Sequence, residues 1–267
     1  MRFITADIIF DGYKYLPKDT ILSISEEGII LNISQEKNLE YVKKYDGMLM
    51  PGMINAHCHL ELSHMKNKID EKTGLVNFLL SVMKMRNNFS KEEIKNSIEH
   101  AEKEMIKNGI VAVGDISNTL DSLAQKEKRN LRYHTFIECL GVRSNKALDI
   151  IAESKKLQHE FSKTHDATLA LHAPYSVSND LIKYLDEENK EKITSIHNQE
   201  SEQENKLFLK KEGDFLKLFE VIHFDVNDFE TKQKNAIQTY FSKLKETKNI
   251  MLVHNTFASK EDIDFVN

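Results

Sequence analysis

The sequence predicts an α/β protein in which parallel strands alternate with helices, preceded by a small β-sheet. From Met53 onward, six short apolar runs alternate with helical segments of ~10–20 residues, the pattern of successive β/α units. Residues 1–50 contain only short strand-like runs separated by glycine and proline. We therefore expect a β-rich N-terminal domain over residues 1–50 and a β/α domain over residues 51–267.

Length, charge and cysteine content narrow the class of protein. With 267 residues, 40% of them apolar, the chain can bury a sizeable core. A formal charge of −5 with interspersed Lys and Glu argues against a nucleic-acid partner. We expect neither a signal peptide nor a membrane-spanning segment, because the first residues lack a basic region followed by a long apolar run and no window approaches the ~18 apolar residues that span a bilayer. Two cysteines without a spacing pattern fit a reducing compartment, so we expect a cytoplasmic protein without a membrane partner. The sequence carries no pattern that indicates the oligomeric state, so a homo-oligomer is compatible with it.

Each element follows from a local pattern. Three short strands are expected at residues 3–10, 20–25 and 28–33. The sharp turn Pro51-Gly52 then leads into an apolar strand from Met53 to His59. Ser90 and Glu93 form a capping box that starts a helix, which Gly109 ends. The remaining strands are expected at 110–115, 133–141, 167–172, 193–197 and 250–254, and the remaining helices at 147–163, 179–188, 202–219 and 231–246.

Histidines stand at the carboxyl ends of several of these strands. His57 and His59 end the first strand of the second domain, and His172, His197 and His254 end its fourth, fifth and sixth strands. In a parallel β/α barrel, that edge carries the catalytic groups. The other six histidines do not close strands in this way, and we expect them to be structural or solvated.

The histidine pattern predicts a metal site with a nearby carboxylate. His57 and His59 project to one side of their strand because side chains alternate with period two, and His197 completes a three-histidine set. Glu200, one turn beyond His197, is placed to act as base and then acid on a water whose pKa the metal lowers from 15.7 towards ~7. Glu202 and Glu204 are expected to be solvated carboxylates at a helix start.

Three further residues are candidates for contact with substrate or water. His172, beside the rigid turn Ala173-Pro174, is placed to exchange a hydrogen bond with a substrate heteroatom. His254 is expected to hold the hydroxide in line. Arg143, in the loop after the third strand, is a candidate for meeting an anionic group of the substrate.

At these residues the chain resembles one branch of the amidohydrolase superfamily, which contains adenosine, S-adenosylhomocysteine and aminofutalosine deaminases and related chlorohydrolases. The matching segments are PGMINAHCHLELS (51–63), LALHAPYSVS (169–178), SIHNQESEQEN (195–205) and LVHNT (252–256). Their order and spacing together are specific to this branch, whereas H-x-H alone is not. HCHLELS and HNQESEQE are similar to the aminofutalosine deaminase group, but they do not fix a substrate.

The resemblance implies a fold, a cofactor and a reaction. It implies a β-sandwich built from both chain termini and a (β/α)₈ TIM barrel. His57, His59 and His197 would bind one divalent ion, usually zinc and sometimes iron. Glu200 would move the proton, His254 would contact the attacking water and His172 would touch the substrate ring. The reaction would be hydrolytic deamination of a small molecule of the aminopurine-nucleoside type.

The chain departs from the family pattern at its C-terminal end. The family supplies a fourth metal ligand, an aspartate from strand eight, and Asp262 and Asp264 do not match that position. About six of eight barrel strands are present, so we expect an incomplete barrel, the N-terminal portion of a longer or truncated reading frame, with weak metal retention and little turnover. Two alternatives stay open: amide or chloride hydrolysis at the same metal site, and an inactive metal-binding fragment.

Overall fold

A computed structural model describes residues 1–36 and 41–267 and divides the chain into two compact units, Met1–Met53 and Ile54–Asn267. The first unit is a four-stranded sheet with the order β3-β2-β1-β4, in which β1 is antiparallel to β2 and parallel to β4. Three of its strands were expected, whereas β4 lacks an alternating apolar pattern and six of its seven residues are exposed. The bounds are β1 Arg2–Ile9, β2 Ile21–Ile24, β3 Ile30–Ser34 and β4 Lys43–Leu49.

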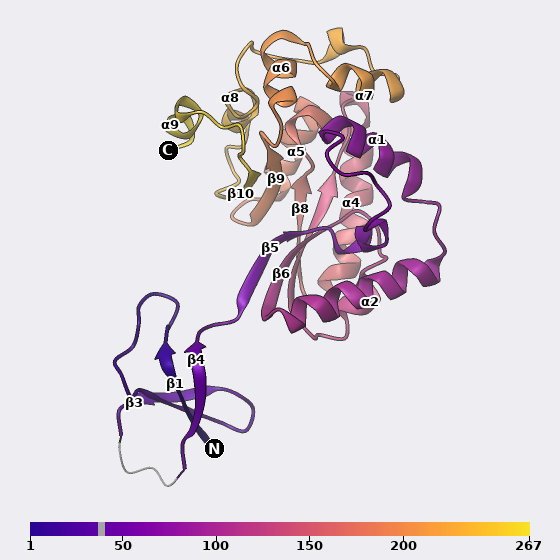
Figure 1. The fold of residues 1–267 in the computed structure, drawn as a ribbon. Coiled ribbons are helices and arrows are strands. Elements are labelled where there is room, and N and C mark those ends of the chain that lie inside the picture. Colours follow the sequence, from indigo (N-terminus) through magenta and orange to yellow (C-terminus); the bar gives the residue numbers. More distant parts are fainter. Residues whose placement is uncertain (37–40) are drawn as a thin grey trace. The chain divides into compact units, whose positions relative to one another are not determined.

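The second unit contains the six predicted β/α strands (Figure 1). β5 to β8 form one sheet in chain order, and β9 pairs with β10 in parallel. The backbone N–H of His197 in β9 donates to the carbonyl of His172 at the end of β8 (2.9 Å), which joins the two groups of strands. The bounds are β5 Met53–Cys58, β6 Ile110–Ser117, β7 Arg132–Cys139, β8 Asp166–Leu171, β9 Ile193–Asn198 and β10 Asn249–His254.

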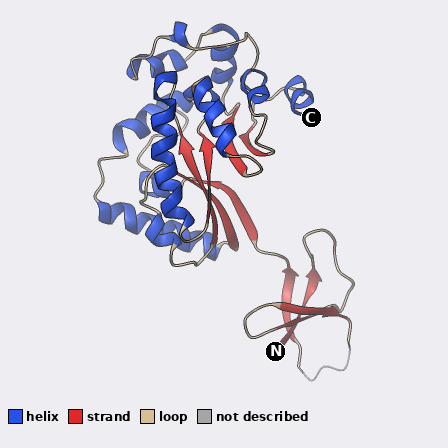
Figure 2. Cartoon of the chain, turned by 180° about the vertical axis from the view of Figure 1, so that it is seen from behind, coloured by secondary structure: helices blue, strands red, loops and turns tan. Residues whose placement is uncertain are grey.

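Helices pack around these strands (Figure 2). The predicted capping box begins α2, since Ser90 Oγ accepts from Glu93 N (3.2 Å) and Glu93 Oε2 accepts from Ser90 N (2.8 Å). The helix α1 was not predicted. The bounds are α1 Leu75–Met85, α2 Lys91–Lys107, α3 Leu123–Lys126, α4 Ala147–Ser162, α5 Asn179–Glu188, α6 Glu202–Lys210, α7 Phe215–Val221, α8 Ala236–Tyr240 and α9 Lys260–Val266.

Two predicted helices differ from the structure. The single helix expected over 202–219 is broken into α6 and α7, because Lys211 (φ 55°) and Gly213 (φ 95°) adopt left-handed backbone conformations. The helix expected over 231–246 is reduced to α8 and a 3₁₀ turn at Phe241–Lys243. Residues 231–235 carry no apolar side chain that could anchor an extra turn.

The interior of the β/α unit is narrow and packed. Ile116, Phe136 and Ala170 from three neighbouring strands form a buried cluster, with Met251 of β10 against it. Gly114 allows β6 to approach β5 closely, because a Cβ at this position would lie 2.4 Å from the carbonyl oxygen of Ala56. Side chains two residues after these cluster residues point to the same inner side of the strands. They therefore lie one layer above the packed interior, at the carboxyl ends of the strands. In the described parts of the chain, no helix has the length and apolar character needed to cross a membrane.

Candidate active site

Every strand of the β/α unit brings at least one polar side chain to a cavity at the carboxyl edge. The cavity has a volume of about 440 Å³. Its other walls are largely apolar and come mainly from α1 and α7, which Figure 1 shows beyond the arrowheads of the strands. The six strand-end residues that line it are, in strand order, His57, Asn118, Glu138, His172, His197 and His254.

The three histidines predicted as metal ligands line the same cavity, but their ligand atoms fall into two groups with mutual distances within 4.8 Å: His57 with His197 and His254, and His59 with His197 and Glu138. The Nε2 atoms of His59 and His197 are 3.2 Å apart. The ring centre of His57 lies 5.0 Å from that of His59 and 4.8 Å from that of His197. His197 Nδ1 donates to the carbonyl oxygen of His172 (2.6 Å), so the lone pair of its neutral ring is on Nε2. A tetrahedral zinc with nitrogen ligands at ~2.0–2.1 Å separates those nitrogens by about 3.3 Å, so the spacing of this pair fits a bound ion.

The charge state of these rings also suits a metal. Burial lowers the pKa of His57 and of His197 to about 4, with neighbouring histidines contributing. Burial and the surrounding histidines hold the pKa of His59 well below its ordinary value. The rings are therefore neutral at neutral pH, the form that donates a lone pair to a metal. His57 Nδ1 is buried without a hydrogen-bond partner among the described residues. The donor set thus fits a divalent ion.

A buried ion pair supports the turn that carries the first two histidines. Asp115 Oδ1 of β6 accepts from the backbone N–H of Leu60 (2.7 Å), the residue that follows His59. Its other oxygen pairs with Lys126 Nζ of α3 (2.6 Å), and both side chains are completely buried. Lys126 also donates to Ser117 Oγ and Thr135 Oγ1. This pair was not predicted from the sequence, because a lysine in a polar segment is usually solvated.

Glu200 and His254 lie next to each other in the lining of the cavity. Glu200 Oε2 lies 3.5 Å from His254 Nε2. Burial raises the pKa of Glu200, and His254 opposes that shift. The position of Glu200 is set by Glu204, whose Oε1 accepts from Glu200 N (2.7 Å). The expectation that Glu204 is solvated was wrong: its side chain is buried and caps the start of α6.

A left-handed turn directs His254. His254 (φ 76°) and Asn255 (φ 56°) both have positive φ, which is uncommon for residues other than glycine. The turn is held by Asn198 of β9, whose carbonyl accepts from Asn255 N (2.9 Å) and whose Nδ2 donates to Asn255 Oδ1 (2.9 Å). Adjacent strands therefore fix both members of the Glu200–His254 pair.

His172 and Arg143 occupy different kinds of position. Ser176 Oγ donates to the carbonyl of Ala173 (2.9 Å), so it accepts from His172 Nδ1 (2.6 Å). Burial lowers the pKa of His172 to about 4, and the Nε2 of its neutral ring is left as an acceptor. Arg143 also lines the cavity, but its NH2 group donates to the carbonyls of Ile222 (3.0 Å) and His223 (2.6 Å). That nitrogen ties the loop after β7 to the end of α7.

A polar chain that was not predicted from the sequence reaches the cavity. Arg86, which follows α1, donates to Glu61 (3.1 Å) and to Asn118 Oδ1 (2.8 Å), and Asn118 Nδ2 donates to Glu138 Oε2 (3.0 Å). Glu138 Oε1 is buried without a hydrogen-bond donor among the described residues. The available signal was the location of Glu138 near the end of β7, the same edge on which the histidines were recognised.

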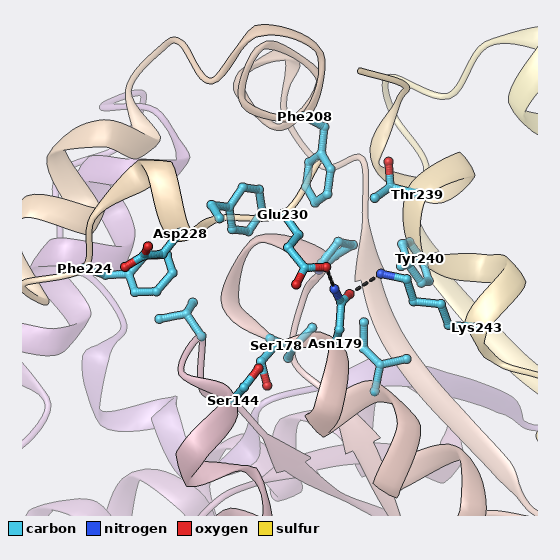
Figure 3. A pocket seen from close by; sticks show the side chains of 15 residues that line it. Ser144, Ser178, Asn179, Phe208, Phe224, Asp228, Glu230, Thr239, Tyr240 and Lys243 are labelled. Atoms are coloured by element: carbon cyan, nitrogen blue, oxygen red, sulfur yellow. Dashed lines mark hydrogen bonds between the residues drawn. The ribbon is translucent and has the colours of Figure 1, made fainter. Parts of the chain in front are cut away.

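A second, smaller pocket lies around Asn179 at the start of α5 (Figure 3). Asn179 accepts from Lys243 and donates to Glu230, so these polar groups satisfy one another. The pocket has a volume of about 40 Å³, and its lining contains no histidine. It is too small for a nucleoside-sized molecule. A third pocket, of about 710 Å³, shares His59 and Glu200 with the histidine-lined cavity, so that cavity and this adjoining space form the candidate active site.

The parallel strands, the histidine cluster at their carboxyl edge and the adjacent carboxylate place the chain among β/α-barrel proteins of the amidohydrolase type. The Amidohydrolase family model matches residues 48–267, and the chain belongs to this family. Proteins of the family generally bind a divalent metal ion. The α/β barrel fold predicted from the sequence is confirmed, with six of the strands of such a barrel in the described residues.

Named relatives are deaminases. The chain is 30% identical over 223 residues to an adenosine deaminase from Helicobacter pylori, covering 81% of this chain and 53% of the relative. It is 29% identical over 231 residues to an aminodeoxyfutalosine deaminase from a Nitratiruptor species, covering 83% and 54%. The structure is similar to that of Helicobacter pylori aminofutalosine deaminase in complex with methylthio-coformycin, with a TM-score of 0.77, 25% identity and coverage of 100% of this chain and 67% of that chain. The chain spans about half the length of the curated relatives it matches.

Proposed function

We propose that this chain carries the catalytic groups of a metal-dependent hydrolytic deaminase that acts on an aminopurine-nucleoside-like substrate. The observation that carries the proposal is the pair of His59 and His197 nitrogens at a metal-ligand separation of 3.2 Å, with Glu200 and His254 lining the same cavity. The names of the deaminase relatives support the same class of substrate. The free cysteines, Cys58 and Cys139, are consistent with the proposed cytoplasmic location.

His57, His59 and His197 would hold the metal, which we propose to be zinc, with iron as the alternative. The bound ion would lower the pKa of a water molecule from 15.7 to about 7 and so supply a nucleophile at neutral pH. Glu200 takes the proton of that water and passes it to a ring nitrogen of the substrate. His254, whose Nε2 lies 3.5 Å from Glu200 Oε2, would contact the attacking water and hold it in line.

The reaction that follows from these roles balances without a further reagent. Water oxygen adds to the ring carbon that bears the amino group, and a ring nitrogen takes the proton. The tetrahedral carbon then collapses, the C–N bond breaks and the amino group leaves as ammonia after a second proton transfer through Glu200. His172 Nε2 is placed as an acceptor toward the substrate, and the remaining guanidinium nitrogens of Arg143 are proposed to meet an anionic substituent.

Two alternative functions of the same site are hydrolysis of an amide or a carbon–chlorine bond, and metal binding without turnover. The last is favoured by one observation: the metal-type clusters of the described residues contain histidines and Glu138 but no aspartate. A three-nitrogen site without a fourth ligand would exchange its metal more readily.

Ammonia release tests the proposal. The purified chain, loaded with one equivalent of zinc, is assayed with adenosine, aminodeoxyfutalosine, S-adenosylhomocysteine and a chlorinated triazine. We expect zinc-dependent ammonia release from at least one nucleoside. Glu200→Gln should lose about 10²–10⁴-fold in kcat while it keeps its zinc. Glu202→Gln is the matched control, because Glu202 is exposed at the start of α6 and should leave turnover unchanged. Release of chloride or an acid alone, or zinc binding without turnover, would contradict deamination.

A further inference from the structure

Glu138 is one of the six strand-end residues that line the cavity, and its Oε1 atom has no hydrogen-bond partner among the described residues. Glu138 follows Phe136 by two residues in β7, and Phe136 belongs to the packed interior of the strands. Ile137 and Cys139, on the opposite face, pack in the core beneath the helices. Glu138 therefore points inward, one layer above the interior cluster, and lines the same cavity as the metal-site histidines.

The two oxygens of this carboxylate have different surroundings. Oε2 accepts from Asn118 Nδ2 (3.0 Å), and the orientation of the amide is fixed because its oxygen accepts from Arg86, which can only donate. Arg86 is in turn paired with Glu61. Oε1 has no hydrogen-bond donor among the described residues, although Glu138 is only 7% exposed. A buried acceptor without a donor is energetically unfavourable. Glu138 Oε1 is therefore available to accept a hydrogen bond from a molecule bound in the cavity.

The nearest histidine does not fill this acceptor. Oε1 lies 3.9 Å from His197 Nδ1, beyond hydrogen-bonding distance, and that nitrogen already donates to the carbonyl of His172. The metal-facing nitrogen of His197 is Nε2, at the opposite side of the ring, 3.2 Å from His59 Nε2. One Glu138 oxygen nevertheless lies within 4.8 Å of ligand nitrogens of His59 and His197, so Glu138 borders the proposed metal ligands, and the zinc content of a variant distinguishes a ligand from a substrate contact.

We propose that Glu138 Oε1 accepts a hydrogen bond from an N–H or O–H group of the substrate and so selects substrates that carry a donor close to the reacting ring. This proposal rests on the proposed deaminase function. In an aminopurine nucleoside the available donors are the exocyclic amino group and the sugar hydroxyls. The chain Glu61–Arg86–Asn118 holds the carboxylate still, so the substrate meets a preorganised acceptor.

Glu138→Gln gives a directed test. The new amide must turn its oxygen to Asn118 Nδ2, which places its NH₂ group where Oε1 stood. A substrate donor would then face another donor. We expect kcat/KM for adenosine to fall about 10- to 100-fold, the range for loss of a hydrogen bond to a charged group, with zinc content unchanged. Glu102→Gln is the matched control: Glu102 is buried and hydrogen-bonded to Tyr133 and Asn130, but it does not line the cavity.

Substrate analogues identify the donor and separate this role from a structural one. The wild-type and E138Q proteins are compared on adenosine, 2′-deoxyadenosine, 3′-deoxyadenosine and 6-chloropurine riboside, each of the last three lacking one donor. We expect the penalty of E138Q to disappear with one of these analogues only. A partly unfolded variant would lose activity equally on all substrates, so the ratio between substrates is unaffected by misfolding.

Several results would overturn the proposal. An equal penalty on every analogue, or no penalty at all, would show that Glu138 meets no substrate donor. Loss of zinc from E138Q would identify Glu138 as a metal ligand instead. If the zinc-loaded wild-type chain processes none of the nucleosides, the proposed function itself fails and the role of Glu138 fails with it.

Discussion

Removing the charge of Asp115 should destabilise the β/α unit more than removal of any exposed carboxylate. Asp115 accepts from Leu60 N (2.7 Å), Ser117 Oγ (3.1 Å) and Lys126 Nζ (2.6 Å), and it is completely buried. Asp115→Asn leaves the buried ammonium of Lys126 with two hydroxyl acceptors and no counter-charge. An uncompensated buried charge costs about 3–5 kcal/mol. That is a large part of the ~5–15 kcal/mol that stabilises a domain.

Urea unfolding of the metal-free protein, followed by circular dichroism, measures this loss. Glu153→Gln is the control, because the Glu153–Lys156 pair is 70–71% exposed and such pairs contribute at most ~1 kcal/mol. The double variant Asp115→Asn/Lys126→Met should recover much of the lost stability, since it also removes the unpaired buried charge of Lys126. If D115N costs less than ~1 kcal/mol, or if the double variant is no more stable than D115N, the ion pair does not hold this region together.

The same residue links stability to the metal site. In D115N the amide oxygen can still accept from Leu60 N, so the turn that carries His57 and His59 keeps its anchor. Asp115→Ala removes that acceptor, and we expect zinc affinity to fall about 10-fold or more in this variant alone, in the range known for residues that orient metal ligands. Equal zinc affinities of D115A and D115N, measured by competition with a chelator, would refute the positioning role.

Two further predictions concern a ligand and a carboxylate remote from the site. His197→Ala should abolish stoichiometric zinc binding in metal analysis, whereas His100→Ala, an exposed position on α2, should not. Although burial raises it, the backbone N–H groups of residues 245–247 hold the pKa of Asp186 below its ordinary value. A lowered folded-state pKa stabilises the protein above the unfolded value of ~3.9, and this contribution is lost as pH falls through the folded value. Asp186→Asn should therefore be less stable than wild type at pH 7, and the deficit should shrink below pH ~4 in urea titrations.

The fold and the location of the histidines were predictable because the sequence patterns that indicate them are uncommon. Only 11 of 267 residues are histidines, so their placement at successive strand ends stands out from the background. The capping box at Ser90 and Glu93 was equally direct, because two side chains at fixed spacing satisfy two backbone groups. Helix lengths were less predictable. The break between α6 and α7 depends on Lys211 adopting a left-handed conformation that lysine seldom takes.

The acidic residues of the site could not be predicted from the sequence, because Asp and Glu are common throughout the chain. Asp and Glu together number 42, so one more glutamate near a strand end carries little information until its neighbours are known. Glu138 acquires its meaning from Asn118 and Arg86, which lie 20 or more residues away in sequence. Lys126 is likewise one of 37 basic residues, and only the packing of α3 shows that it is buried. Such pairings depend on tertiary contacts that the sequence pattern does not encode.

The alternation of side chains along each strand assigns these polar residues to two separate tasks. In β6, Asp115 and Ser117 face outward and join the ion pair that supports the H-x-H turn, whereas Asn118, just past the strand, faces the cavity. In β7, Glu138 faces the cavity while Cys139 packs in the core. A slip of one residue in register would exchange the two faces of a strand and remove its contribution to the cavity. The site therefore depends on the register of all six strands at once, since the end of each strand supplies at least one of its side chains.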